Sequence, residues 1–175
     1  MAKKVGVLCR LRNILSINAK ICIYNTIVRP HLNYCATILY MASGRAINRL
    51  QILQNRAIRC ILNCNRYTSI KKMLNKLEWL NVRNGLLLNV LVFIFKLDKG
   101  LLPKYFSEYM VRNKDIHNYN TRNKDKLRSK LAKKCNNRRG LLHGGIEEYN
   151  RLPDIIRQSK NVDSFVKYLK KYLCK

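Results

Sequence analysis

Three observations predict a mainly α-helical fold for this chain of 175 residues. Glycine is scarce, with 7 residues, and proline occurs only at positions 30, 103 and 153. Apolar residues recur at helical spacing in several segments, and no alternating run is long enough to indicate a sheet. An apolar share of 47% is sufficient for a hydrophobic core in a chain of one-domain length.

The predicted helices of the first half follow one another with short interruptions. A first helix is expected over about residues 3–15, and Ser16 can cap a second helix that Pro30 should kink or break. The best amphipathic segment begins after Ser43, and one of its faces carries Ile47, Leu50, Ala57, Ile58 and Ile61. Ser69 then begins a short helix whose inward side chains are expected to be Ile70, Met73, Leu74 and Leu77.

A longer helix is predicted over about residues 82–99, beginning after Asn81, and it is apolar nearly all round. Such a helix is normally buried inside a protein. Because a chain of this size has few other elements to surround it, a neighbour outside the chain is one possible cover.

The character of the sequence changes after Pro103. Residues 112–139 hold eleven Lys and Arg and two Asp with few large apolar groups, which predicts a basic linker or arm that is poorly ordered alone. Apolar spacing returns over 141–152 and in a terminal helix with Phe165, Leu169 and Leu173. The predicted organisation is a helical region over 1–111, the basic arm over 112–139 and a C-terminal helical tail over 140–175.

Charge is the strongest functional indication in the sequence. The chain has 36 Lys and Arg against 9 Asp and Glu, which gives a formal net charge of +27. No carboxylate precedes Glu78, so the fourteen basic residues of 1–77 have no acidic partner in their own segment. Such an excess destabilises a compact state by self-repulsion unless an anionic partner relieves it. Nucleic acid is the commonest partner of this kind.

The shortage of carboxylates also argues against metal-dependent catalysis. Polymerase and phosphoryl-transfer chemistry holds two metal ions about 3.5–4 Å apart on closely placed Asp and Glu side chains. The only adjacent acidic pair is Glu147 with Glu148, whose side chains point in different directions on a helix. We therefore predict no catalytic residue and no cofactor, and we do not expect the chain to be an enzyme on its own.

Seven cysteines, an odd number without a tight framework, and an N-terminus without a signal-type apolar stretch predict a reduced intracellular protein, nuclear or cytoplasmic. Two pairs at i,i+4 spacing, His31 with Cys35 and Cys60 with Cys64, offer four potential zinc ligands. Burial as ordinary core cysteines is favoured instead, so no metal is predicted. The most apolar stretch is shorter than the roughly 18 residues of a membrane span, and no membrane partner is predicted.

Four arginines form a row along the amphipathic segment that follows Ser43. At 100° per residue, Arg45, Arg49, Arg56 and Arg59 fall within an arc of about 80°, opposite the apolar face. Guanidinium groups suit bidentate phosphate contacts. An ordinary solvated face is the alternative, but no acidic residue alternates with these arginines to make i,i+4 pairs. We assign the four side chains, called the Arg row below, to phosphate contact.

The basic arm offers a second set of candidates. Its basic residues are interleaved with Tyr119 and His117, a mixture that can neutralise phosphates and stack bases. Segments of this composition are equally typical of nuclear-localisation signals and of solvated linkers. The candidate nucleic-acid-binding residues of the arm are Tyr119, Arg122, Lys124, Lys126 and Arg128.

Five short motifs occur in an order that resembles one known family. They are YNTIVRPHLNYC at 24–35, LQILQNRAIR at 50–59, YNTR at 119–122, YNRLP at 149–153 and SFVKYLK at 164–170. Together they resemble the C-terminal thumb and tail of reverse transcriptases of non-LTR retrotransposons of the jockey type. The likeness extends over nearly the whole chain. Where the family usually has Trp, this chain has Tyr149, and the retained bulky ring suggests packing rather than chemistry.

The resemblance implies a helical thumb-like bundle that grips a template-primer duplex behind an active site, and the Arg row falls within the second motif. The family's fingers and palm, with their paired catalytic Asp residues, are missing from this sequence, so polymerase activity is not implied. A palm-containing polymerase is then an additional partner. The helix over 82–99 would lie against that palm or against the chain's own tail.

Three functions remain open at this point. The first is a catalytically incomplete remnant of a retrotransposon RNA-directed DNA polymerase, which binds the phosphate backbone of RNA or DNA duplexes without sequence specificity. The second is a small basic structural nucleoprotein associated with RNA or chromatin, which scattered charge would favour over a one-faced Arg row. The third is a docking module for a separate polymerase subunit, which a large exposed apolar patch would favour.

Overall fold

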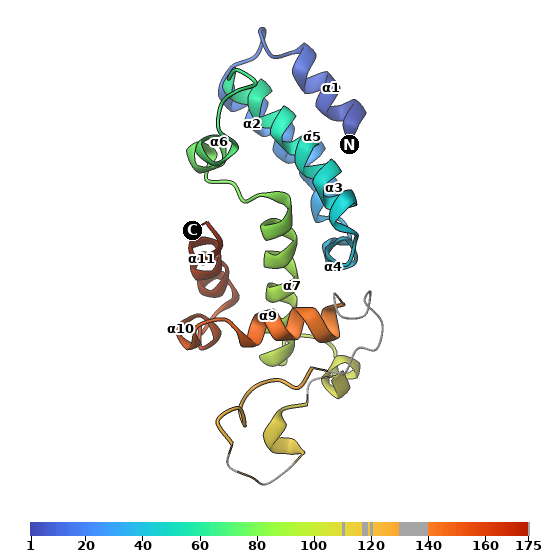
Figure 1. Ribbon diagram of the computed structural model, residues 1–175, viewed down its shortest axis with the longest axis vertical. Helices are drawn as coiled ribbons and strands as arrows, with labels where there is room; N and C mark the ends of the chain where they lie inside the picture. Colours follow the sequence, from blue (N-terminus) through green and yellow to red (C-terminus); the bar gives the residue numbers. More distant parts are fainter. Residues whose placement is uncertain (110, 117–118, 120, 130–139, 175) are drawn as a thin grey trace. The chain divides into compact units, whose positions relative to one another are not determined.

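The computed structural model describes residues 1–109, 111–116, 119, 121–129 and 140–174. Within these residues the fold is mainly α-helical and contains no strand, as the sequence predicts (Figure 1). The chain divides into two compact units, which are described separately. Unit 1 comprises Met1–Leu86 with Leu173–Lys175, and unit 2 comprises Leu87–Tyr172. The predicted segment boundaries near 111 and 139 stay a prediction.

Unit 1 contains a succession of helices that begin mostly where the sequence predicts. Ser16 and Ser43 cap their helices, because the N–H groups of Ala19 and Ala46 donate to the two hydroxyl oxygens, each at 3.3 Å. The first helix ends sooner than the predicted residue 15. The elements are α1 (Ala2–Arg10), α2 (Ile17–Ile23), η1 (Tyr24–Val28), α3 (Pro30–Asn33), α4 (Ala36–Tyr40), α5 (Gly44–Leu62), α6 (Ile70–Leu77) and the start of α7 (Val82–Asp98).

Pro30 interrupts the second predicted helix through a π-helical turn. In η1 the N–H of Arg29 donates to the carbonyl of Tyr24, five residues back, at 2.9 Å. Pro30 then occupies the first turn of α3. Because proline has no N–H, it can begin a helix without losing a backbone hydrogen bond. The predicted break is therefore confirmed, and its form is a wider turn followed by a new helix.

Three helices end with a residue in the left-handed conformation. In each case the following N–H reaches back five residues to a carbonyl of the helix, which is the Schellman arrangement. Only glycine adopts this conformation without steric cost, so the larger residues at two of the three ends carry some backbone strain. The left-handed residues are Asn63 (φ 50°) after α5, Glu78 (φ 53°) after α6 and Gly100 (φ 67°) after α7.

The core of unit 1 lies along the inward face of α5. Ala57 and Ile61 are fully buried against α1 and η1, and Ile58 packs against Met73 of α6. Ile47 belongs to a neighbouring cluster with Leu32, Ala36, Val82 and Leu86. The predicted apolar face of this helix is thus confirmed. Ile70 was expected to point inward from α6, but its side chain is 39% exposed because it lies in the first turn, at the edge of that helix.

Lys20 is a buried cation that the sequence did not indicate. The residue is 1% exposed, and its Nζ donates to Oδ1 of Asn63 at 3.4 Å. Asn63 caps the C-terminal end of α5, where the helix dipole is negative. This lysine can therefore be buried without a carboxylate partner, because the negative end of the helix dipole and the Asn63 side chain interact favourably with its ammonium group.

Cys9 and Cys60 form a disulfide that joins α1 to α5, with their Cα atoms 5.4 Å apart. The expectation of an entirely reduced chain is wrong at this pair. The two cysteines are separated by 51 residues in sequence, so only the packing of α1 against α5 brings them together. The other cysteines that the structure describes, Cys22, Cys35, Cys64 and Cys174, are free thiols.

Unit 2 is built around the apolar part of α7. Phe95 stacks on Phe165 of α11 at a centroid distance of 4.2 Å, and Tyr149 of α9 lies 6.3 Å from the same ring. The chain's own tail therefore covers this part of the helix. Of the two alternatives, a missing palm or the tail, the structure contains the second for the described residues. The further elements are η2 (Lys104–Tyr109), η3 (Asn113–Asp115), η4 (Leu141–Gly145), α9 (Ile146–Asn150), α10 (Asp154–Arg157) and α11 (Val162–Leu173).

None of the described helices is by itself long and apolar enough to span a membrane. The bent pair formed by α6 and α7 passes the test of length and composition only when the two helices are taken together.

Part of the predicted basic arm is folded onto unit 2. Leu127 is only 5% exposed, and the side chain of Asn150 brackets it. The carboxamide accepts the N–H of Leu127 at 3.2 Å and donates to its carbonyl at 2.8 Å. For residues 121–129 the expectation of a poorly ordered segment is therefore wrong, because one apolar side chain and one carboxamide fix it. His117 and residues 130–139 lie outside the described part of the chain.

Candidate nucleic-acid interface

The Arg row lies on the face of α5 that points away from the core of unit 1. The helix runs without interruption over 19 residues, which corresponds to a length of about 28 Å. Arg45, Arg49 and Arg56 are exposed, and Arg59 is half-buried. Since the apolar face of the same helix is buried, the helical phase inferred from the sequence is the one the structure contains.

Arg59 differs from the other three arginines. Its Nε is buried and has no hydrogen-bond partner within the residues that the structure describes. A buried donor without a partner costs about 1–3 kcal/mol. The packed stem therefore restricts the position of this guanidinium group at one end of the row, while the group still lacks an acceptor.

Ile52 lies within the Arg row, which the sequence interpretation missed. Its side chain is 64% exposed. At 100° per residue it falls about 20° from Arg45 and inside the arc of the four arginines. The helical spacing of the sequence alone was therefore sufficient to place Ile52 among them. An apolar side chain among guanidinium groups suits the sugar or base surface of a strand rather than its phosphates.

No ion pair joins the described residues of unit 1. The ion pairs formed between described side chains use carboxylates from Asp98 onward. Glu78, the single acidic residue of 1–86, is exposed at the end of α6. The pKa of His31 is lowered from its usual value, chiefly by the positive charge of Lys4. The positive charge of unit 1 is therefore not offset by ion pairs among the residues that the structure describes.

The arm candidates belong to unit 2 and fall into two groups. Arg122 and Lys126 line a cavity of about 430 Å³. Tyr119, Lys124 and Arg128 are exposed and do not line it, and the side chain of Tyr119 is 79% exposed.

Acidic residues share the cavity with Arg122 and Lys126. Asp98 accepts from Arg112 Nη2 at 2.5 Å and from the hydroxyl of Tyr149 at 3.1 Å. Asp125 and Asp154 are also among the lining residues. Burial, followed by the charge of Asp98, raises the pKa of Tyr149 well above its usual value. Three carboxylates therefore offset much of the cavity's positive charge.

The two pairs considered as zinc ligands are not formed as helical pairs. His31 lies in α3, and Cys35 has a left-handed conformation (φ 51°) beyond the end of that helix, so the two side chains do not share one face. Cys60 is bonded to Cys9, and Cys64 lies past the end of α5. Across the described ranges, no three His, Cys, Asp or Glu side chains converge as a metal site.

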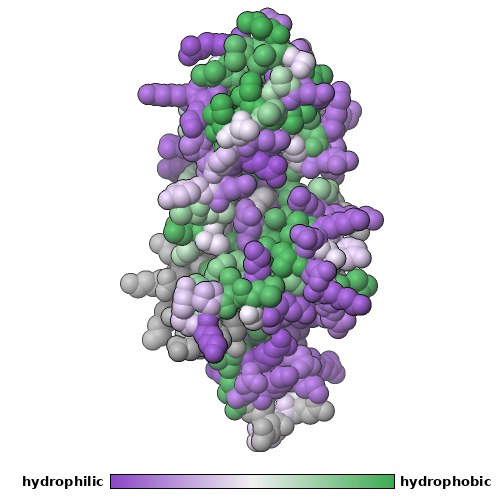
Figure 2. Space-filling view, turned by 180° about the vertical axis from the view of Figure 1, so that it is seen from behind, coloured by the Kyte–Doolittle hydropathy of each residue, from purple (hydrophilic) through white to green (hydrophobic). Residues whose placement is uncertain are grey.

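Polar and apolar side chains are mixed on the molecular surface. Figure 2 shows hydrophobic groups at the top and through the middle of the face drawn, with hydrophilic side chains around and between them. Exposed apolar residues of unit 1 include Val7, Ile14 and Ile17 near the connection of α1 to α2.

Comparison of the chain with protein-family models, with curated proteins and with solved structures finds no match. No family is assigned on that basis.

Proposed function

We propose that this chain binds the phosphate backbone of nucleic-acid duplexes without sequence specificity, as a thumb-like remnant of a retrotransposon reverse transcriptase with no catalysis of its own. One observation carries the proposal: four arginines occupy one outward face of a continuous helix in a unit that has no ion pair among its described residues. The five ordered motifs support the thumb-like assignment.

The dimensions of the Arg row suit a duplex. Arg45 and Arg59 are 14 residues apart, which is about 21 Å along the helix axis. A duplex strand has one phosphate for about every 3.4 Å of axis, so this length faces about six phosphates. Exposed Ile52 adds an apolar contact to the same surface.

The proposal is tested by the salt dependence of binding to RNA, DNA and hybrid duplexes of unrelated sequence. If about six phosphates are neutralised, log K should fall with log salt with a slope near −5. Replacement of Arg45, Arg49, Arg56 and Arg59 by Gln should make the slope shallower by about 0.9 for each phosphate that the variant no longer neutralises. A wild-type slope close to zero would contradict the proposal.

The control removes the same number of charges elsewhere. Replacement of Arg122, Lys124, Lys126 and Arg128 by Gln changes the arm, where nearby carboxylates already offset part of the charge. This variant should lose less affinity than the Arg-row variant. Equal losses would mean that total charge alone matters, and would favour the second candidate, a structural nucleoprotein that binds RNA or chromatin. A palm-containing polymerase is a further proposed partner of the thumb-like surface.

A further inference from the structure

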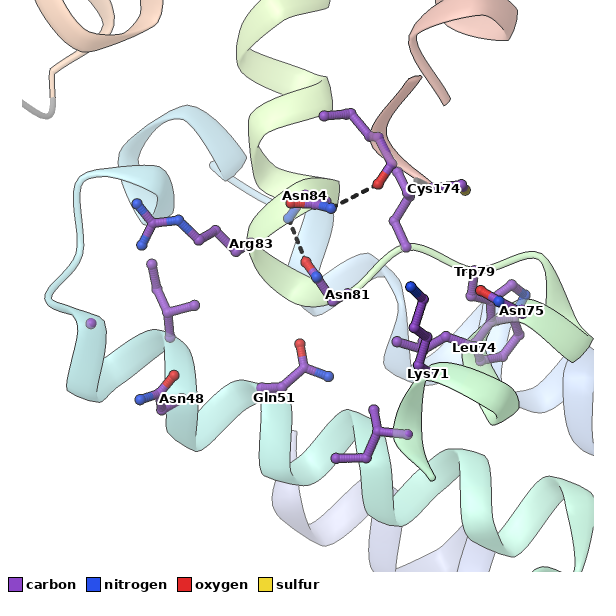
Figure 3. A pocket seen from close by; sticks show the side chains of 15 residues that line it. Asn48, Gln51, Lys71, Leu74, Asn75, Trp79, Asn81, Arg83, Asn84 and Cys174 are labelled. Carbon is purple, nitrogen blue, oxygen red and sulfur yellow. Dashed lines mark hydrogen bonds between the residues drawn. The ribbon is translucent and has the colours of Figure 1, made fainter. Parts of the chain in front are cut away.

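A cavity of about 540 Å³ in unit 1 lies beside the Arg row (Figure 3). The lining comes from α5, α6, the connection over 79–81 and the start of α7, together with Leu173 and Cys174. Its volume is within the range of about 300–1,000 Å³ that is typical of small-molecule sites. The phosphate contacts proposed for the Arg row do not use this space.

The floor of the cavity is fixed by hydrogen bonds within the chain. Gln51 accepts the N–H of Val82 at 2.8 Å, and its amide nitrogen lies 2.8 Å from the side-chain oxygens of both Gln54 and Asn55. Asn81 caps α7 by accepting the N–H of Asn84 at 2.7 Å. Because these carboxamides already have hydrogen-bond partners within the chain, they fix the shape of the cavity and are not the groups that would bind a ligand.

The rim of the cavity contrasts with its floor. Asn48, Lys71, Asn75 and Arg83 are exposed lining residues, and no side-chain hydrogen bond or ion pair within the described chain involves them. The lining contains two cations and no carboxylate. The two free carboxamides can both donate and accept hydrogen bonds. An occupant should therefore be an anion that also has a polar edge.

Figure 3 shows how these groups are distributed. Arg83 lies on the side of Asn48, whereas Lys71 lies on the other side with Asn75 and Trp79. Buried Ile47 and Leu74 contribute apolar surface to the lining. A nucleotide has the matching features, with an anionic phosphate at one end, a planar apolar face and a polar base edge.

The cavity is also continuous with the Arg row along α5. At 100° per residue Asn48 is about 60° from Arg45 and about 40° from Ile52, so it lies between the row and the cavity. A strand whose phosphates contact the row can therefore direct its next nucleotide past Asn48.

We propose that this cavity binds one nucleotide, with the phosphate against Arg83 and the base edge against Lys71 and Asn75. The nucleotide is either free or the unpaired end of a strand on the Arg row. The second form rests on the function proposed above, whereas binding of a free nucleotide does not.

The single tryptophan of the chain, Trp79, lines the cavity and supplies a direct readout. The full chain is titrated with the four ribonucleoside 5′-monophosphates while the tryptophan emission is recorded. A saturable change is expected. The corresponding nucleosides and inorganic phosphate each lack half of the contacts and should bind about tenfold more weakly. Absence of a saturable response to all four monophosphates would overturn the proposal.

Two paired substitutions separate the cavity from general charge. Lys71→Gln with Arg83→Gln removes both lining cations and should weaken monophosphate binding about tenfold. The matched control is Lys72→Gln with Lys76→Gln, because both lysines are exposed on α6 and neither lines the cavity. The control should change binding less than about twofold. Equal weakening in both variants would overturn the proposal.

Hairpin duplexes distinguish the two sources of the nucleotide. One hairpin is blunt and the other carries one unpaired terminal nucleotide. If the strand end is the source, the second should bind about five- to tenfold more tightly, and the Lys71 and Arg83 variant should abolish the difference. Equal binding of both hairpins together with monophosphate binding assigns the cavity to a free nucleotide. Monophosphate binding with a salt slope near zero would contradict the Arg-row function alone.

Discussion

Tyr149 combines packing and polar roles in one side chain. Its ring is 2% exposed and lies against the aromatic cluster of Phe95 and Phe165. Its hydroxyl donates to Asp98, which also pairs with Arg112. The interpretation of Tyr149 as a packing residue is confirmed, and the hydroxyl adds a polar anchor that links α9 to the end of α7.

The raised pKa of Tyr149 predicts a loss of stability at high pH. Burial and Asp98 keep the hydroxyl protonated in the folded chain, whereas an unfolded tyrosine ionises near pH 10. The contribution of Tyr149 to the free energy of unfolding is therefore complete below about pH 10 and declines as the pH rises above that value. The free energy of unfolding, measured with urea, should fall less between pH 9 and pH 11 for Tyr149→Phe than for wild type. Parallel declines would contradict this assignment.

Among elements, α9 has an effect beyond its 5 residues because Asn150 fixes the backbone of Leu127. Asn150→Ala should remove both hydrogen bonds and lower the free energy of unfolding by about 2–3 kcal/mol. Trypsin should also cut more rapidly after the basic residues of 122–128. The control Asn18→Ala changes an exposed amide of α2. Unchanged cleavage rates in the Asn150 variant would show that other contacts hold the segment.

The link between α1 and α5 leads to a prediction about their disulfide. In the chain-entropy account, closing a loop of 51 residues stabilises a protein by about 4 kcal/mol. Replacement of Cys9 and Cys60 by Ser should lower the free energy of unfolding by an amount of that order. The control is Cys22→Ser, at a free exposed thiol. If peptides containing Cys9 and Cys60 are alkylated without prior reduction, the disulfide is absent in solution.

The elements also show which features the sequence could predict. The starts at Ser16, Ser43 and Asn81 were predictable because capping is a local interaction, and the Arg row was predictable from helical phase. The ends at Asn63 and Glu78 were not, because neither residue is the glycine that usually marks a left-handed position. Three further features could not be predicted, because each joins residues from separate elements: the disulfide, the contact of Asn150 with Leu127 and the cavity lining.

At the scale of the whole molecule, the net charge of +27 opposes folding. Added salt screens repulsion between exposed charges, with a screening length of about 10 Å at 0.1 M. Thermal denaturation should therefore occur at a higher temperature in 0.5 M than in 0.05 M sodium chloride. The Arg-row variant, which carries four fewer charges, should gain less. A lower melting temperature at high salt would mean that internal attraction outweighs repulsion.

Gly145 lies where a larger residue would not fit, and this restricts how the sequence can change while the protein still folds. A Cβ at this position would lie 2.9 Å from side-chain atoms of both Val90 and Ile94, which are buried and have little room to move. A Cβ at Gly6 or Gly85 would meet nothing within 4 Å. If the retrotransposon origin proposed above holds, diverged genomic copies of this sequence that are still selected to fold should keep glycine at 145 and vary at 6 and 85. Copies that decay freely should vary at all three, so this one position separates a maintained protein from a relic.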